Sequence, residues 1–247
     1  MVHIWHEDST ESSTSTMWKF LVKEKFNKKV QFEIFGTNGN GKLVQKVMSN
    51  KYTDEDIYII FIDVPFNNEK TLGIYRDLME LTEDIKNVYV AKIICFEDLI
   101  LKFKLLREWT RPTNEEAAIR YDSIYSIVEE FNKNGWQNSI ELREYIKKKY
   151  EMSLDKVSSE KVAALLLTDL TRMSKARFRV SKTQLGDCWT SSCCNFINLS
   201  HFCSLSKDML SSKEKAEYIY KMTSIKHILD NALKFFREMG IEEIRDS

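Results

Sequence analysis

The sequence predicts an α/β protein with a small, mainly parallel sheet flanked by helices, followed by a mostly helical C-terminal region. Three observations predict this fold. Ile57–Asp63 is β-branched and aromatic with almost no polar break, as in a central strand covered on both faces. Strand-like and helix-like segments alternate through the first third of the chain, which favours parallel strands joined by crossovers. After Arg111 and Pro112 the strand patterns stop.

Each element follows from its own pattern. The predicted strands cover 1–6, 30–35, 57–63 and 88–94, and the helices among them cover 12–26, 42–48, 69–82 and 97–106. The first helix opens with Ser and Thr caps and carries Trp18 on an apolar stripe. Later helical patterns cover 115–133, 139–150, 158–174 and 212–238. We therefore predict two domains, 1–108 and 109–247.

Composition limits the class of protein. The 37 basic residues equal the 37 acidic ones, so the chain is no bulk polycation, and binding of nucleic acid would need a local basic patch. No apolar run is long enough for a bilayer, and the first residues lack a secretory signal pattern. The five cysteines do not follow a secreted disulfide framework. These features favour a cytoplasmic protein that does not insert in a membrane.

Three acidic residues follow predicted strands. Glu7 follows the first strand, Asp63 ends the third, and Glu97 follows the fourth. Because the carboxyl ends of parallel strands meet at one edge, these acids predict a site for Mg²⁺ or Mn²⁺. Such ions activate water and stabilise the leaving oxygen of a phosphodiester. The alternative is that the acids only stabilise helix N-termini through the helix dipole.

The order of these residues resembles a Toprim domain: a glutamate after the first strand, a glycine-containing turn after the second, and an aspartate ending an apolar third strand. The Ser/Thr-rich turn entering an aromatic helix over 7–20, and Cys-Phe-Glu before an apolar helix over 95–103, resemble the RloB and overcoming-lysogenization-defect (OLD) nuclease group. The resemblance covers about residues 1–105. It implies that Glu7, Asp63 and Glu97 bind metal and cut nucleic acid, in an anti-phage defence effector that works with a partner ATPase.

The chain departs from that family at two places. The first motif is His6-Glu7-Asp8 instead of glutamate-glycine, so Asp8 is either a further ligand or a solvated residue, and an acidic position after the third strand is lost. Asp63 is followed by Val64 and Pro65, so proline stands where the family has a second aspartate, and Asn67 and Asn68 would be weaker oxygen ligands. An inactive binding or scaffold subunit of a defence complex is therefore the alternative to a nuclease. For the nuclease, RNA, including tRNA, and DNA are both candidate substrates. A homo-oligomer is a further expectation.

A glycine-rich loop follows the second strand. Residues 36–43 fit G-x-x-x-x-G-K between a strand and a helix, as in a P-loop, but Leu43 replaces the hydroxyl that binds Mg²⁺. We expect the backbone amides and Lys42 to contact a substrate phosphate. A nucleotide-binding regulator is the other function that this loop suggests.

Two features of the C-terminal half add candidate sites. Cys188, Cys193, Cys194 and Cys203 lie close together in sequence beside His201, as ligands of a structural Zn²⁺ or as buried free thiols. Arg177 and Arg179 alternate with apolar residues, which predicts a cationic face for a phosphate backbone or a charged edge strand.

Overall fold

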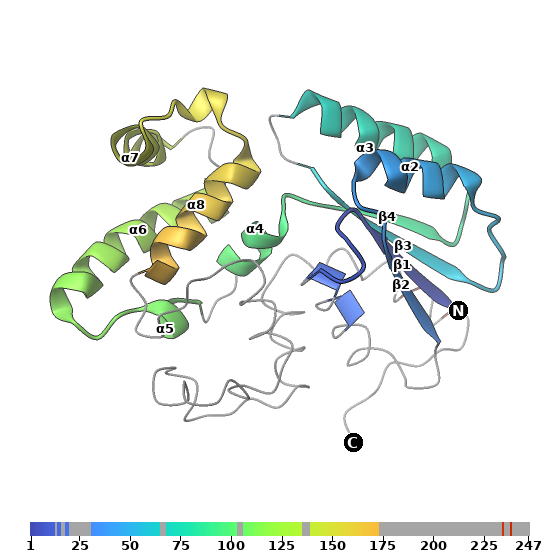
Figure 1. The fold of residues 1–247 in the computed structure, drawn as a ribbon, viewed down its shortest axis with the longest axis horizontal. Helices are drawn as coiled ribbons and strands as arrows, with labels where there is room; N and C mark the ends of the chain where they lie inside the picture. The colour runs from blue at the N-terminus through green and yellow to red at the C-terminus, as the bar shows by residue number, and fades with distance from the viewer. Residues whose placement is uncertain are drawn as a thin grey trace, which may run out of the picture.

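The protein folds around a four-stranded parallel sheet in the order β2-β1-β3-β4 (Figure 1). This computed structural model describes residues 1–12, 14–15, 18–19, 31–64, 68–102, 106–134, 139–172, 234 and 238. The strands are β1 (Val2–His6), β2 (Phe32–Gly36), β3 (Ile57–Asp63) and β4 (Val88–Ile93). The helices are α2 (Asn40–Ser49), α3 (Glu69–Thr82), α4 (Phe96–Leu101), α5 (Leu106–Thr110), α6 (Glu115–Asn134), α7 (Ile140–Tyr150) and α8 (Ser159–Arg172), with a 3-10 turn η1 (Leu154–Lys156). The predicted α/β class is confirmed.

Strand β3 is the buried centre of the sheet, as its apolar sequence predicts. All of its residues are buried, with β1 on one side and β4 on the other. The register pairs His6 of β1 with Phe61, and Asp63 with Ile93 of β4. Because side chains alternate along a strand, the odd-numbered residues of β3 face one layer of helices and the even-numbered residues face another.

Helices α2 and α3 cover the face of the even-numbered residues of β3. They lie side by side along the sheet (Figure 1). Leu43 and Val47 of α2 and Leu78 of α3 enter the same buried cluster as Trp5 of β1. The apolar stripes of these two helices thus account for one of the two cores.

The opposite face of the sheet joins the later helices in a second core. Trp18 stacks on Phe61 with their ring centroids 3.7 Å apart. The buried cluster continues from there through Leu99 of α4 to Leu166 of α8. Helix α4 leads from β4 towards the group formed by α6, α7 and α8 (Figure 1). None of the described helices is both long and apolar enough to cross a membrane.

One predicted helix is divided in the structure. We expected a single helix over 97–106, but α4 ends at Leu101 and α5 begins at Leu106, with 103–105 outside the described residues. Leu99, Ile100, Leu101 and Leu106 are all buried, so the apolar residues continue from α4 into α5 and the sequence does not mark the break between them. The predicted domain boundary after residue 108 falls inside α5 and stays a prediction. The helix predicted over 212–238 lies outside the described residues, apart from Lys234 and Glu238.

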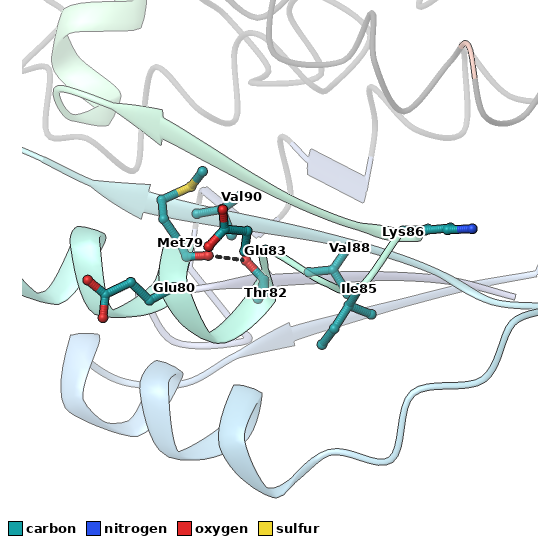
Figure 2. A pocket seen from close by; sticks show the side chains of 8 residues that line it. All are labelled: Met79, Glu80, Thr82, Glu83, Ile85, Lys86, Val88 and Val90. Atoms are coloured by element: carbon teal, nitrogen blue, oxygen red, sulfur yellow. Dashed lines mark hydrogen bonds between the residues drawn. The ribbon is translucent and has the colours of Figure 1, made fainter.

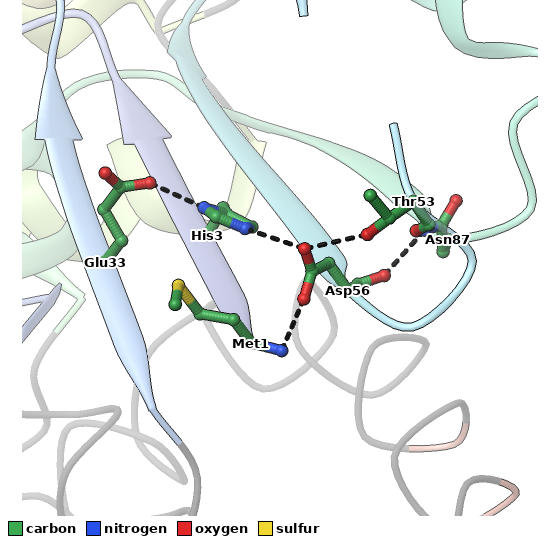
Figure 3. Close-up of polar contacts among 6 residues, drawn as sticks. All are labelled: Met1, His3, Glu33, Thr53, Asp56 and Asn87. Atoms are coloured by element: carbon green, nitrogen blue, oxygen red, sulfur yellow. Dashed lines mark hydrogen bonds and ion pairs between the residues drawn. The ribbon is translucent and has the colours of Figure 1, made fainter. Parts of the chain in front are cut away.

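A polar network fastens the amino ends of the strands (Figure 3). His3 of β1 lies 2.6 Å from a carboxylate oxygen of Glu33 on β2 and 3.4 Å from one of Asp56, which precedes β3. The amino-terminal ammonium is 2.6 Å from the other Asp56 oxygen. Partial burial opposes ionisation of Asp56, but hydrogen bonds from the ammonium, Thr53 and His3 outweigh it and lower its pKa to about 2. Glu33 and Asp56 at this edge of the sheet therefore have structural partners.

Candidate active site at the carboxyl edge of the sheet

Strands β1 and β3 end side by side where the strand order reverses. From β1 the chain moves outward to β2, and from β3 it moves outward to β4 in the opposite direction. In open parallel sheets, ligands bind beyond the carboxyl ends of the strands at such a switch point. Glu7 directly follows β1 and Asp63 is the last residue of β3, so both flank this point. Glu97 lies after β4, in the first turn of α4.

The loop that carries Glu7 is held against the loop that follows β2. The Gly39 N–H donates to the Glu7 carbonyl oxygen at 2.6 Å. Gly36 permits this approach, because a Cβ there would lie 2.3 Å from the carbonyl oxygen of Asp8 and 2.3 Å from the amide nitrogen of Thr10. One carboxylate oxygen of Glu7 is also buried. The position of Glu7 is therefore set by β1 and by this pair of loops.

The same hydrogen bonds change the interpretation of the glycine-rich loop. The N–H groups of Thr37, Asn38 and Gly39 all donate to carbonyl oxygens of residues 6–8 at the end of β1. Gly39 has φ 120°, a conformation that glycine adopts at little cost. Because protein carbonyl groups already accept from these three amides, the phosphate contact predicted for this loop would have to use its other amides. Lys42 is exposed in the first turn of α2 at this edge and remains a candidate phosphate contact.

Asp63 and Glu97 act on one buried neighbour, the thiol of Cys95. Burial raises the pKa of Cys95 well above its usual value, and the carboxylates of Glu97 and Asp63 raise it further. The thiol therefore stays protonated at neutral pH, which makes it a poor nucleophile and a poor metal ligand. Because both carboxylates influence the same group, negative charge is concentrated where β3 and β4 end.

Asp98 is a buried carboxylate beside this site that the sequence analysis did not select. Its side chain is 1% exposed, and Oδ2 lies 2.6 Å from the Lys102 ammonium. Burial raises the pKa of Asp98, and Lys102 opposes that shift. Oδ1 is buried without a hydrogen-bond partner among the described residues. The sequence signal for this pair is an acid and a lysine at i, i+4, a spacing that is common on exposed helix faces and so did not indicate burial.

His6 is a second residue that the sequence did not single out. It is the last residue of β1, is 1% exposed, and faces the same side of the sheet as Phe61 and Asp63. Its Nε2 lies 2.7 Å from the Oγ of Ser15, and the histidine tautomer decides which atom donates. A buried imidazole–hydroxyl pair thus stands one residue before Glu7. Alternation along β1 could have indicated the face of His6, whereas its contact with Ser15 depends on how the next segment packs.

The described residues do not form a cage of three carboxylates. Within them, no group of three or more His, Cys, Asp and Glu side chains is placed to hold a metal ion. Asn68, which we expected as an oxygen ligand, caps α3 instead, and its Oδ1 accepts from the Thr71 N–H at 3.1 Å. Pro65 and Asn67 lie outside the described residues. A site of one or two carboxylates completed by water and phosphate oxygens, as Mg²⁺ often takes, would need fewer protein ligands than such a cage.

The other predicted site residues lie outside the described part of the chain. They are the basic pair Arg177 and Arg179 and the cluster Cys188, Cys193, Cys194 and Cys203. The phosphate contact and the Zn²⁺ site predicted for them stay predictions.

The fold and this edge define a parallel α/β protein with acidic residues at its switch point. No protein-family model, curated protein or solved structure matches the chain. The resemblance to Toprim nucleases therefore rests on the residues quoted above.

Proposed function

We propose that the carboxyl edge of the sheet is the active site of a nuclease that cuts RNA, including tRNA, or DNA with Mg²⁺ or Mn²⁺. The observation that carries this proposal is the meeting of Glu7 and Asp63 at the switch point between β1 and β3. Stabilisation of a helix dipole does not explain Asp63, since it ends β3 and α3 begins only at Glu69. That simpler explanation does apply to Glu97 in the first turn of α4.

The charge at this edge fits a cation. Asp63 is 9% exposed, so little water screens its charge, and both Asp63 and Glu97 raise the pKa of the buried Cys95 thiol. We expect Asp63 to be the main ligand, with Glu97 or Glu7 as the second. A bound Mg²⁺ or Mn²⁺ would supply an activated water and would stabilise the leaving oxygen.

The chain's own residues would orient the substrate and move protons. Lys42 is exposed at the start of α2, where its ammonium can neutralise a substrate phosphate. Glu7 is held by its backbone to the loop after β2, and its carboxylate is the candidate general base or acid. The amides of Thr37, Asn38 and Gly39 already donate to the end of β1, which disfavours a nucleotide-binding regulator that would use this loop.

The test compares wild type with Asp63→Asn on labelled tRNA, single-stranded DNA and double-stranded DNA, in Mg²⁺ or Mn²⁺. We expect wild type to cut at least one of these substrates and Asp63→Asn to cut it at least about 100-fold more slowly. Binding of Mn²⁺, measured by calorimetry without substrate, should weaken in the same variant. The matched control is Glu55→Gln, an exposed acid just before β3 at the opposite edge of the sheet, which should change neither measurement.

Two results would contradict the proposal. Equal rates of cleavage by wild type and Asp63→Asn would show that cleavage does not take place at this edge. If wild type cuts none of the substrates and Asp63→Asn binds Mn²⁺ as well as wild type does, this edge is not a metal site either.

The second candidate function is a catalytically inactive binding or scaffold subunit. The absence of a three-member metal group among the described residues favours it. Binding of labelled tRNA that is unchanged in Asp63→Asn and in the presence of a chelator, with no cleavage, would support this function. From the resemblance we also propose a cytoplasmic role in anti-phage defence beside a partner ATPase, under either function.

A further inference from the structure

A groove lies between the second half of α3 and the outer strand β4 (Figure 2). Val88 and Val90 of β4 form its apolar floor, and Met79 and Ile85 form its sides. Its cavity volume is about 480 Å³, within the roughly 300–1,000 Å³ of ligand pockets. Met79 is 43% exposed, so an apolar wall of the groove is open to a partner.

Half of the backbone N–H and C=O groups of β4 lie in the plane of the sheet and point away from β3, beside this groove. Among the described strands, β4 pairs only with β3. The carbonyl oxygen of Asn87 accepts from Tyr58, and that of Ile93 accepts from Val64. In a parallel ladder, alternate residues turn their N–H and C=O groups to the same neighbour. The odd-numbered residues of β4 therefore bond to β3, and the even-numbered residues turn theirs to the outer edge, which is open among the described strands.

Val90 both lines the groove and turns its backbone groups away from β3. Its side chain is on the floor of the groove, while its N–H and C=O face the open edge. Lys92, two residues later, is exposed, and its Nζ lies 5.2 Å from the centre of the Tyr75 ring. A lysine on an edge strand discourages pairing with another chain. The amino half of β4 has apolar residues instead, so a partner strand would pair there.

The charge around the groove indicates the chemistry of the partner. Glu80 and Glu83 of α3 line the groove together with one base, Lys86, and all three are exposed. Figure 2 shows Glu83 close to Met79, on the side of the helix that faces the strand. Between residues 76 and 86, four exposed acids stand against two exposed bases. A partner with positive charge would be attracted to this surface.

We propose that the groove binds an extended, basic segment of a partner protein, which pairs with the amino half of β4 as an additional strand. Small branched side chains at alternate positions of that segment would pack on Val88 and Val90, and basic side chains at the flanking positions of the same face would lie near Glu80 and Glu83. Main-chain hydrogen bonds supply affinity in this mode of recognition, and alternate side chains supply specificity. The proposal does not depend on the activity at the carboxyl edge.

The first test uses the full chain and a labelled peptide, Lys-Thr-Val-Thr-Val-Thr-Lys, whose valines and lysines share one face of an extended strand, in a fluorescence anisotropy titration. Two control peptides have glutamate in place of lysine, or the same sequence with N-methylated amides. We expect saturable binding of the basic peptide, and binding of both controls at least about tenfold weaker. Equal binding of the N-methylated peptide would overturn strand addition, because that peptide cannot donate main-chain hydrogen bonds.

The second test locates the binding. Val90→Pro removes one outward N–H and no hydrogen bond to β3, so an edge strand should tolerate it. Glu83→Lys reverses one charge at the groove, and Glu144→Lys makes the same change on an exposed position of α7 as the control. We expect Val90→Pro and Glu83→Lys each to weaken binding of the basic peptide about tenfold. Glu144→Lys should leave its affinity unchanged.

Two outcomes would overturn the proposal. Unchanged binding of the basic peptide by both Val90→Pro and Glu83→Lys would show that it does not bind in this groove. Self-association of the free chain in sedimentation velocity that Val90→Pro abolishes would assign the groove to a second copy of the chain instead.

Discussion

Gly36 determines how closely the loops after β1 and β2 can approach. A Cβ at this position would lie 2.3 Å from the backbone of Asp8 and 2.3 Å from that of Thr10, and backbone atoms cannot move aside as a flexible side chain can. We therefore expect Gly36→Ala to lower the free energy of unfolding by about 2 kcal/mol or more. Urea denaturation followed by circular dichroism measures this change.

Gly73 provides the matched control at the residue scale. It lies within α3, and an added Cβ would meet nothing within 4 Å. Alanine there should raise the free energy of unfolding by about 0.5–1 kcal/mol, because glycine weakens a helix interior. If Gly36→Ala were as stable as wild type, the close approach of the two loops described here would be incorrect.

At the scale of elements, a buried carboxylate joins α7 to α8. Asp169 of α8 is 2% exposed and accepts hydrogen bonds from the hydroxyls of Tyr145 and Tyr150 on α7. The Lys149 ammonium lies 2.7 Å from its other oxygen. Burial raises the pKa of both tyrosines, and the bond to Asp169 raises it further, so both hydroxyls remain donors through neutral and mildly alkaline pH. This cluster supplies the polar contact between the two helices.

We expect Tyr145→Phe to lower the free energy of unfolding by about 1–2 kcal/mol, because the hydroxyl that donates to Asp169 and accepts from Lys149 is lost, while Tyr150 and Lys149 still satisfy Asp169. The double variant Tyr145→Phe/Tyr150→Phe should lose more free energy of unfolding than the sum of the two single losses, since the Asp169 carboxylate then keeps only Lys149 as a partner. Chemical denaturation of the three variants gives the coupling. Tyr75→Phe, whose ring contact with Lys92 is retained, is the control. Additive single changes would argue against a shared network.

The elements also show what the sequence could predict. Helix α3 and strand β3 have the predicted bounds, because an amphipathic stripe and an apolar run mark them directly. That Glu7 and Asp63 share an edge follows from parallel order alone. Their placement on neighbouring strands does not, since strand adjacency depends on how the helices pack. The bonds of the Gly39 amide and of Asn68 were likewise not predictable, because each depends on local chain geometry that residue type does not specify.

At the scale of the whole molecule, one apolar core crosses from the sheet to the described helical region. Val2 of β1, Ile59 of β3 and Leu99 of α4 belong to the same buried cluster as Leu166 of α8. Helix α4 contacts both β4 and α8, so it connects the two parts directly. A continuous core of this kind favours cooperative unfolding, although the sequence predicted a boundary after residue 108.

This continuity predicts that a change in α8 destabilises the sheet. Leu166→Ala should lower the free energy of unfolding by about 2–5 kcal/mol, because it empties a fully buried position. Hydrogen exchange by mass spectrometry over a urea series should then show β3 and α6 losing protection together, at a lower urea concentration than in wild type. Ile119→Ala, at a position on α6 that is 66% exposed, is the control and should change little. If α6 lost protection in Leu166→Ala while β3 kept its wild-type midpoint, the sheet and the helices would be two independent units.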